Sequence, residues 1–335
     1  MFNISVLLVL LYTYFTPLFI GLLLTIPMYI SSIFCNNYIA CKIKNIFYTS
    51  IGFILHYFFQ SEFYTNDNSI IKKMFNEKKQ IIVIQNHLSE IDTMYYHSLF
   101  DNNIYDYYNS ISLMKKQIAY QAIGIGIINF FGGDIFLSRN IVRDSFNINN
   151  ISKSNNVIYF FPEGTTFCTE TKNKSNAFCK LQKLPIYKYV LYPRITGLEM
   201  IIKNNNINQI YDLTCIFDNM SIKKYGENFS LGYFLNNRFP KKILINIKKF
   251  NINSKNINKQ AEDIFKYKNN LIENFNGDFN KYQKIKYNYT EGIYSFIIQL
   301  LLSSLSIYLY SQFIFIRYLY LIQIIIFILY LHIFY

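Results

Sequence analysis

The chain has 335 residues, which is enough for one large domain or two modest ones. Hydrophobic residues make up 52% of it and aromatic residues 19%, a composition that excludes a disordered protein. Five Cys with no Cys-x-x-Cys pair indicate neither a disulfide scaffold nor a zinc site. The formal net charge is +13, but residues 1–41 contain no Lys, Arg, Asp or Glu, and residues 292–335 contain only Arg317. A basic middle part therefore lies between two apolar ends.

The N-terminal apolar run, from Val6 to Phe34, is longer than the roughly 20 residues that a membrane-spanning helix needs. It is too long for the apolar core of a cleaved signal peptide, and it lacks an Ala-x-Ala-like cleavage site. We therefore predict a retained membrane anchor over residues 1–41. Pro17 and Pro27 allow either one kinked helix or a re-entrant hairpin.

Residues 42–79 are predicted to connect this anchor to a folded domain. Their apolar stretch, Ile46 to Phe59, is only 14 residues long, which is short for a span. Such a stretch is more typical of a helix that lies at the membrane interface.

The middle of the chain alternates short apolar runs with helical patterns. Strands are predicted at Gln80–Gln85, Asp134–Leu137, Val157–Phe161, Tyr187–Leu191, Ile210–Phe217 and Lys242–Ile247. Helices are predicted at Ile91–Phe100, Ile118–Phe130, Asn140–Ser152 and, as a solvated connector, Asn258–Phe275. This alternation predicts an α/β fold with a mixed sheet flanked by helices and with membrane-embedded helices at the N- and C-terminal ends.

The C-terminal apolar run, from Tyr294 to Tyr335, is about twice the length of one span. Residues 292–335 are therefore predicted to form a C-terminal membrane segment. A break at Ser303–Ser304 or within Gln312–Arg317 would make it a hairpin, which we favour. A long helix lying on the membrane is the alternative.

Lysines flank both apolar runs on the side of the middle domain: Lys42 and Lys44, then Lys281, Lys284 and Lys286. Lys and Arg near the ends of a span prefer the cytoplasmic side. Both flanks therefore predict that residues 80–291 form a cytosolic domain of an integral membrane protein.

Two of the predicted strands end in polar clusters. The first strand leads into Asn86-His87-Leu-Ser-Glu-Ile-Asp92, and the third leads into Phe161-Pro-Glu163-Gly164-Thr165-Thr166. Ligands of open α/β sheets bind beyond the carboxyl ends of the strands. We therefore predict that the two clusters form one site.

His87 and Asp92 are the strongest candidates for chemistry. In one ideal helix, residues five apart point about 140° away from each other, so a contact needs His87 on the turn before the helix. Asp92 would then bind one imidazole nitrogen and leave the other free as a general base. The structural alternative is that Ser89-x-x-Asp92 is a capping box with Asp in place of Glu or Gln.

The pair of sequences NHLSEID and FPEGTT resembles the signature of the glycerolipid acyltransferase family, which includes the 1-acylglycerol-3-phosphate acyltransferases. Phe136-Leu-Ser-Arg139 and Tyr192-Pro-Arg194 occupy the places of two further blocks of that family. Stretches around residues 174–178, 189–197 and 210–214 are similar to the branch that contains lysocardiolipin acyltransferase. The resemblance extends over about residues 80–249 and implies that residues 80–291 form an acyltransferase domain.

The resemblance implies that an acyl group passes from acyl-CoA, as co-substrate, to the hydroxyl of a lysophospholipid at the endoplasmic reticulum. His87 would take the hydroxyl proton and Asp92 would orient His87. The resemblance also implies substrate-binding roles for Asn86, Lys115, Lys116, Arg139, Glu163, Gly164, Thr165 and Arg194. Among them, Asn86 would support the oxyanion, and Glu163, Gly164 and Thr165 would shape the acceptor site. No metal, redox cofactor or nucleic acid is implied.

Thr166 departs from the family pattern, because many phosphatidate-forming members have Arg after the EGT sequence. Arg is favoured for bidentate binding of phosphate, so its loss weakens a simple lysophosphatidate assignment. A larger acceptor such as lysocardiolipin, lysophosphatidylglycerol or lysophosphatidylinositol is the alternative. A non-catalytic, membrane-anchored binding protein is the alternative from another class.

Overall fold

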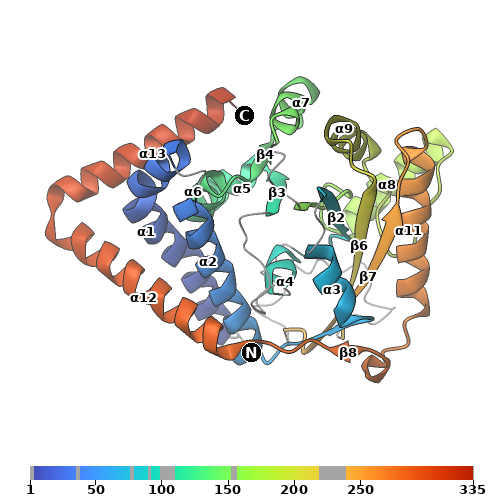
Figure 1. Cartoon of the computed structure of the whole chain (residues 1–335), viewed down its shortest axis with the longest axis horizontal. Coiled ribbons are helices and arrows are strands. Elements are labelled where there is room, and N and C mark those ends of the chain that lie inside the picture. The colour runs from blue at the N-terminus through green and yellow to red at the C-terminus, as the bar shows by residue number, and fades with distance from the viewer. Residues whose placement is uncertain are drawn as a thin grey trace.

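The computed structural model describes residues 4–34, 38–75, 79–89, 92–98, 110–151, 157–218 and 239–334. Its centre is an eight-stranded sheet with the order β4-β3-β5-β2-β6-β7-β1-β8 (Figure 1). The strands are β1 (Glu62–Thr65), β2 (Ile81–Gln85), β3 (Ser110–Lys115), β4 (Ile135–Leu137), β5 (Val157–Phe160), β6 (Gln209–Phe217), β7 (Lys242–Asn251) and β8 (Gln283–Lys284). The pairs β6–β7 and β1–β8 are antiparallel and the other neighbours are parallel, so the predicted mixed sheet is confirmed.

Helices lie on both sides of this sheet, as predicted. They are α1 (Ile4–Phe34), α2 (Tyr38–Tyr57), α3 (Asn68–Phe75), α4 (Asp92–Ser98), α5 (Lys116–Gln121), α6 (Ile123–Phe131), α7 (Ile141–Asn149), α8 (Thr169–Gln182), α9 (Ile195–Asn205), α11 (Ile257–Asn274), α12 (Tyr289–Gln312) and α13 (Ile314–Phe334). Figure 1 shows α1, α2, α12 and α13 gathered on one side of the molecule and α11 on the other.

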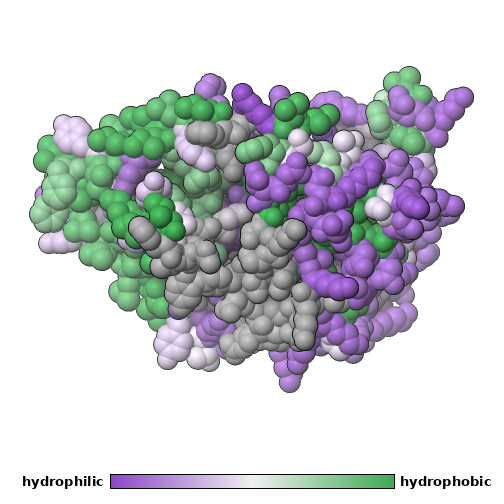
Figure 2. Space-filling model, turned by 45° about the horizontal axis from the view of Figure 1, so that its top comes forward, coloured by the Kyte–Doolittle hydropathy of each residue, from purple (hydrophilic) through white to green (hydrophobic). Residues whose placement is uncertain are grey.

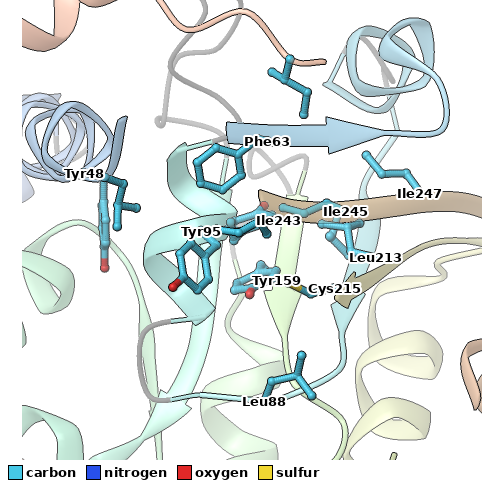
Figure 3. Packing of buried hydrophobic residues seen from close by; sticks show 14 of the residues in the cluster. Tyr48, Phe63, Leu88, Tyr95, Tyr159, Leu213, Cys215, Ile243, Ile245 and Ile247 are labelled. Atoms are coloured by element: carbon cyan, nitrogen blue, oxygen red, sulfur yellow. The ribbon is translucent and has the colours of Figure 1, made fainter. Parts of the chain in front are cut away.

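The central strands β2 and β5 are almost entirely apolar because both faces of the sheet are covered there. All five residues of β2 are buried. Alternate residues enter two different cores: Val157 and Tyr159 of β5 pack in one, and Ile158 and Phe160 in the other. Helices α2, α3 and α4 cover the first core, part of which Figure 3 shows, and α9 and α11 cover the second.

The prediction of a strand at Tyr187–Leu191 is wrong, and the structure shows why. This segment lies between Pro185 and Pro193 and forms no ladder. Its backbone N–H groups bind side chains instead: those of Lys188 and Tyr189 donate to Asn269 Oδ1 at 2.8 and 2.9 Å. Side-chain acceptors from a distant helix thus replace the strand partner that the apolar pattern suggested.

The prediction of a solvated connector near residues 258–275 is also wrong. Helix α11 packs on the sheet and buries one face, on residues Ile257, Ala261, Ile264, Phe265, Lys268 and Ile272. Lys268 is fully buried, forms an ion pair with Asp212 of β6, and donates to the carbonyl oxygen of Leu213 at 2.7 Å. The apolar spacing of three and four residues was present in the sequence, but its Lys and Asn content obscured it.

Among the described residues, three helical segments are long and apolar enough to cross a membrane: Leu11–Ile33, Tyr289–Gln312 and Ile314–Ile333. Helix α1 is continuous through Pro17 and Pro27, which favours the kinked-helix alternative over the hairpin. The C-terminal run breaks at Phe313, inside the predicted Gln312–Arg317 region. Figure 2 shows hydrophobic residues covering this side of the molecule, in contrast to the hydrophilic sheet domain.

Buried polar side chains join these helices to one another. Gln299 of α12 donates to the hydroxyl of Thr16 of α1 at 2.6 Å and accepts a hydrogen bond from Ser50 of α2. Inter-helical hydrogen bonds of this kind hold helices together where lipid offers no polar partner. Gly124 of α6 allows a close crossing with α1, because a Cβ there would lie 2.1 Å from the backbone nitrogen of Leu18.

Helix α2 begins earlier than the predicted 46–59 stretch and packs against α1, α4, α6 and α12. Lys44, treated above as a flanking charge, is fully buried and paired with Asp134. Asp134 Oδ1 also accepts the N–H of Ser112 in β3 at 2.7 Å. Lys44 therefore ties α2 to the sheet and does not act as a free charge at a membrane surface.

Candidate functional site

His87 lies on the turn between β2 and α4, where the predicted contact requires it. Its Nδ1 is 3.1 Å from Asp92 Oδ2. The carboxylate is fully buried, while the imidazole is 16% exposed and therefore reachable. The two side chains thus form a hydrogen-bonded pair at the carboxyl end of β2, in which Asp92 is buried and His87 is partly exposed.

Asp92 also has the structural role of a helix cap, which the sequence offered as the alternative to a catalytic role. Its Oδ2 accepts the backbone N–H groups of Leu88 at 2.6 Å and Ser89 at 2.8 Å. The bond to Ser89 is one half of the predicted capping box. The two interpretations are therefore compatible, because the oxygen that starts the helix is also the oxygen that holds His87.

The hydrogen bonds of Asp92 define the state of the imidazole. Burial raises the pKa of Asp92, while the bonds from His87, Ser89 and Leu88 lower it. Oδ2 already accepts two backbone N–H groups and is therefore an acceptor toward His87 as well, so we assign the ring proton to Nδ1 of His87. This tautomer leaves Nε2 with a free lone pair, which is the requirement for a general base.

Glu163 is placed differently from its predicted role in the acceptor site. Its side chain is buried; Oε1 accepts the N–H of His87 at 3.0 Å and Oε2 accepts the N–H of Leu191 at 2.9 Å. Glu163 thus joins the end of β2 to the segment before α9 and holds the backbone of His87. Burial raises the pKa of Glu163 to about 8, against the lowering effect of these two N–H groups.

Glu163 should make stability fall with rising pH. A carboxyl whose pKa is higher in the folded state than in the unfolded chain keeps its proton only when folded. Between about pH 4.5 and 8 the free energy of unfolding then decreases, by at most about 1.4 kcal/mol per pH unit. We expect Glu163→Gln to reduce this slope, while Glu170→Gln, an exposed change on α8, keeps it. Chemical unfolding in detergent from pH 5 to 8 measures both, and an unchanged slope in Glu163→Gln would contradict the prediction.

Two arginine side chains contact the turn that contains Gly164, and Lys115 lies within range of their charges. Arg139 Nη2 donates to the carbonyl oxygen of Gly164 at 3.4 Å. A Cβ on Gly164 would lie 2.8 Å from Cδ and Nε of Arg194, and Gly164 has a φ of +68° that favours glycine. Burial, then the charges of Arg139 and Arg194, lower the pKa of Lys115. Lys115, Arg139 and Arg194, here called the cationic cluster, have the chemistry of a phosphate site.

The other predicted binding residues make different contacts. The amide of Asn86 binds both polar backbone groups of Cys215 in β6, at 3.0 and 2.7 Å, so its side chain anchors the sheet and does not face an oxyanion. Lys116 Nζ lies 5.5 Å from the centroid of the Tyr120 ring. Thr165 is half-buried in the turn after Gly164.

The residue missed in the sequence is Phe161. Its ring stacks on His87 with the centroids 4.1 Å apart and the planes 16° apart. The available signal was the alternation in the strand, which places Phe161 on the same face as Tyr159. Among the described side chains, no three of His, Cys, Asp and Glu gather as metal ligands would.

Comparison with known proteins identifies the domain that carries this site. Residues 67–216 match the family model described as Acyltransferase, so the chain contains an Acyltransferase family domain. This range includes His87, Asp92 and all three members of the cationic cluster. The resemblance to acyltransferases inferred from the motifs is thereby confirmed.

The similar proteins carry related names. Lysocardiolipin acyltransferase 1 of Gallus gallus is 27% identical over 188 residues, which cover 51% of this chain and 46% of that protein. The 2-acyl-1-lysophosphatidylinositol acyltransferase of Saccharomyces cerevisiae is 24% identical, covering 69% of this chain and 73% of that protein. The crystal structure of the 1-acyl-sn-glycerophosphate acyltransferase of Thermotoga maritima matches 82% of this chain and 99% of its own, with a TM-score of 0.47 and 15% identity. This chain spans about half the length of several of the curated relatives.

Proposed function

We propose that this chain is an integral membrane enzyme that transfers an acyl group from acyl-CoA to a free hydroxyl of a lysophospholipid. The observation that carries the proposal is the His87–Asp92 pair beside the cationic cluster. Glu163 links the two, because it binds the backbone of His87 and immediately precedes Gly164. A base and a phosphate site on adjacent turns match an acceptor whose hydroxyl and phosphate share one glycerol.

In the proposed reaction, His87 Nε2 removes the proton of the acceptor hydroxyl while the oxygen attacks the thioester carbonyl. The carbon–oxygen bond of the new ester forms and the carbon–sulfur bond to coenzyme A breaks. The imidazolium returns its proton to the departing thiolate, so the enzyme ends as it began. Asp92 stabilises the imidazolium through Nδ1. No covalent enzyme intermediate is needed.

The cationic cluster is proposed to bind the phosphate of the acceptor. Arg139→Ala is expected to raise the KM for the lysophospholipid by about 10- to 100-fold, since a charge-assisted hydrogen bond is lost. The kcat and the KM for acyl-CoA should change little. Arg143→Ala is the matched control, because Arg143 is exposed on α7, four residues further along. Initial rates over a range of both substrates measure the effect; equal changes in the two variants would contradict it.

Two acceptor classes follow from the relatives and the motif. The family signature allows 1-acyl-sn-glycerol-3-phosphate as the acceptor and phosphatidate as the product. Thr166, together with relatives named for lysocardiolipin and lysophosphatidylinositol, supports a remodelling enzyme for a larger lysophospholipid. A lysophospholipid panel with labelled acyl-CoA and membranes bearing wild type or His87→Ala separates them. Transfer to lysophosphatidate favours the first class, and transfer only to larger acceptors favours the second. If no acceptor receives an acyl group in a His87-dependent reaction, the alternative of a non-catalytic binding protein is favoured.

The membrane placement is part of the same proposal. We propose that α1, α12 and α13 cross the membrane of the endoplasmic reticulum and that the sheet domain faces the cytosol. The three apolar helices found among the described residues support the membrane location. Lys42, Lys281 and Lys286, which flank the apolar runs on the side of the sheet domain, support the cytosolic orientation. Protease protection of sealed microsomes tests the orientation: the sheet domain should be cut without detergent.

A further inference from the structure

Phe161 follows β5 directly and covers one face of the imidazole of His87. The centroid distance of 4.1 Å and the angle of 16° describe a stacked pair. The hydrogen bond to Asp92 holds His87 at Nδ1 only, and a single bond at one ring atom leaves the ring plane free to tilt. The aromatic face removes that freedom, because tilting the imidazole would break the stack.

The ring of Phe161 is itself supported by the buried core. It meets the ring of Tyr159 edge-on, with centroids 5.2 Å apart and planes at 72°. Tyr159 is fully buried, stacks on Tyr96 at 3.5 Å, and donates a hydrogen bond to Gln85 Oε1 at 3.2 Å. Figure 3 shows Tyr159 within this core. A column of aromatic rings therefore extends from the core to His87.

We propose that Phe161 is a positioning residue for His87 in the proposed acyl transfer. Its ring fixes the imidazole plane, so that Nδ1 stays on Asp92 while Nε2 stays directed at the acceptor hydroxyl. The ring also lies where its π face attracts the imidazolium that forms during transfer. The inference rests on the proposed function, and it adds a residue that acts through His87 and not on the substrate.

The strand supplies a matched control for this role. Phe160 is the next residue along β5, is buried, and packs in the core on the opposite face of the sheet. Phe160→Leu and Phe161→Leu remove the same ring from neighbouring positions, but only the second removes the stack on His87. Phe161→Tyr keeps a ring at the site and is the conservative variant.

The experiment measures kcat and both KM values for wild type, Phe161→Leu, Phe161→Tyr, Phe160→Leu and His87→Ala in the same membranes. We expect Phe161→Leu to lower kcat by about 10- to 100-fold, as expected of a misplaced catalytic group, with both KM values nearly unchanged. Phe161→Tyr should retain most of the activity, and Phe160→Leu should keep the wild-type kcat per folded enzyme.

Two other results would overturn the inference while leaving the acyltransferase proposal intact. One is an equal loss of kcat in Phe160→Leu and Phe161→Leu, which would mean general loss of packing. The other is a loss of activity in Phe161→Leu that appears only in KM, or that is equally large in Phe161→Tyr. If wild type and His87→Ala give the same rates, the proposed function itself fails and the positioning role fails with it.

Discussion

Replacing His87 by Ala is expected to lower kcat/KM for acyl transfer by about 10²- to 10⁴-fold, the contribution typical of a positioned general base. The imidazole is the partly exposed member of the pair, and Asp92 behind it is fully buried and cannot substitute. The loss should appear in kcat, because the cationic cluster that we assign to acceptor binding is untouched. Labelled acyl-CoA and the best acceptor from the panel provide the measurement.

His332→Ala is the matched control for this change. His332 is exposed near the end of α13, far along the chain from the site. It should retain wild-type activity at equal expression. If His87→Ala keeps more than about a tenth of the wild-type rate, a contribution below 10-fold is too small for a general base and the assignment fails.

Asp92→Asn is expected to cost about 10³-fold in kcat/KM while leaving the domain folded. The amide oxygen of Asn can still accept the N–H groups of Leu88 and Ser89, so the start of α4 is kept. The amide has no charge to stabilise the imidazolium that forms on His87 during transfer, so the base loses the electrostatic support of Asp92.

Asp92→Ala separates the two roles of Asp92. It removes the backbone bonds as well, so we expect a lower unfolding midpoint in addition to the lost activity. Asp92→Asn should keep a midpoint near that of the wild type. Activity and thermal unfolding in detergent, measured on the same preparations, provide the test. An active Asp92→Asn enzyme would show that Asp92 serves only as a helix cap.

The relation between His87 and Asp92 was predictable because it is local. Five residues separate them, and the turn that one capping oxygen creates brings them together. The strands β2 and β5 were predictable for a similar reason, since a strand that is buried on both faces is mostly apolar along its length. The three candidate spans follow from length and hydropathy alone.

Residues distant in the sequence required the folded structure. One carboxylate oxygen of Glu163 accepts the N–H of His87 and the other accepts the N–H of Leu191. No spacing in the sequence predicts this bridge. Lys115, Arg139 and Arg194 come from three separate segments, and only the fold brings their charges within range of one another. The same holds for the buried pairs Lys44–Asp134 and Lys268–Asp212, in which Lys44 was taken for a flanking charge and Lys268 for part of a solvated segment.

The sequence by itself determined the apolar ends, the alternating core strands and the two motifs, because each depends on neighbours a few residues away. Only the tertiary structure decided which backbone groups Asn86 and Glu163 bind and which cationic side chains lie near one another. It also decided that Phe161 stacks on His87. The physical reason is that hydrogen bonds and ion pairs in a buried site are set by whichever groups the packing brings within about 3 Å. Local pattern does not encode those distances.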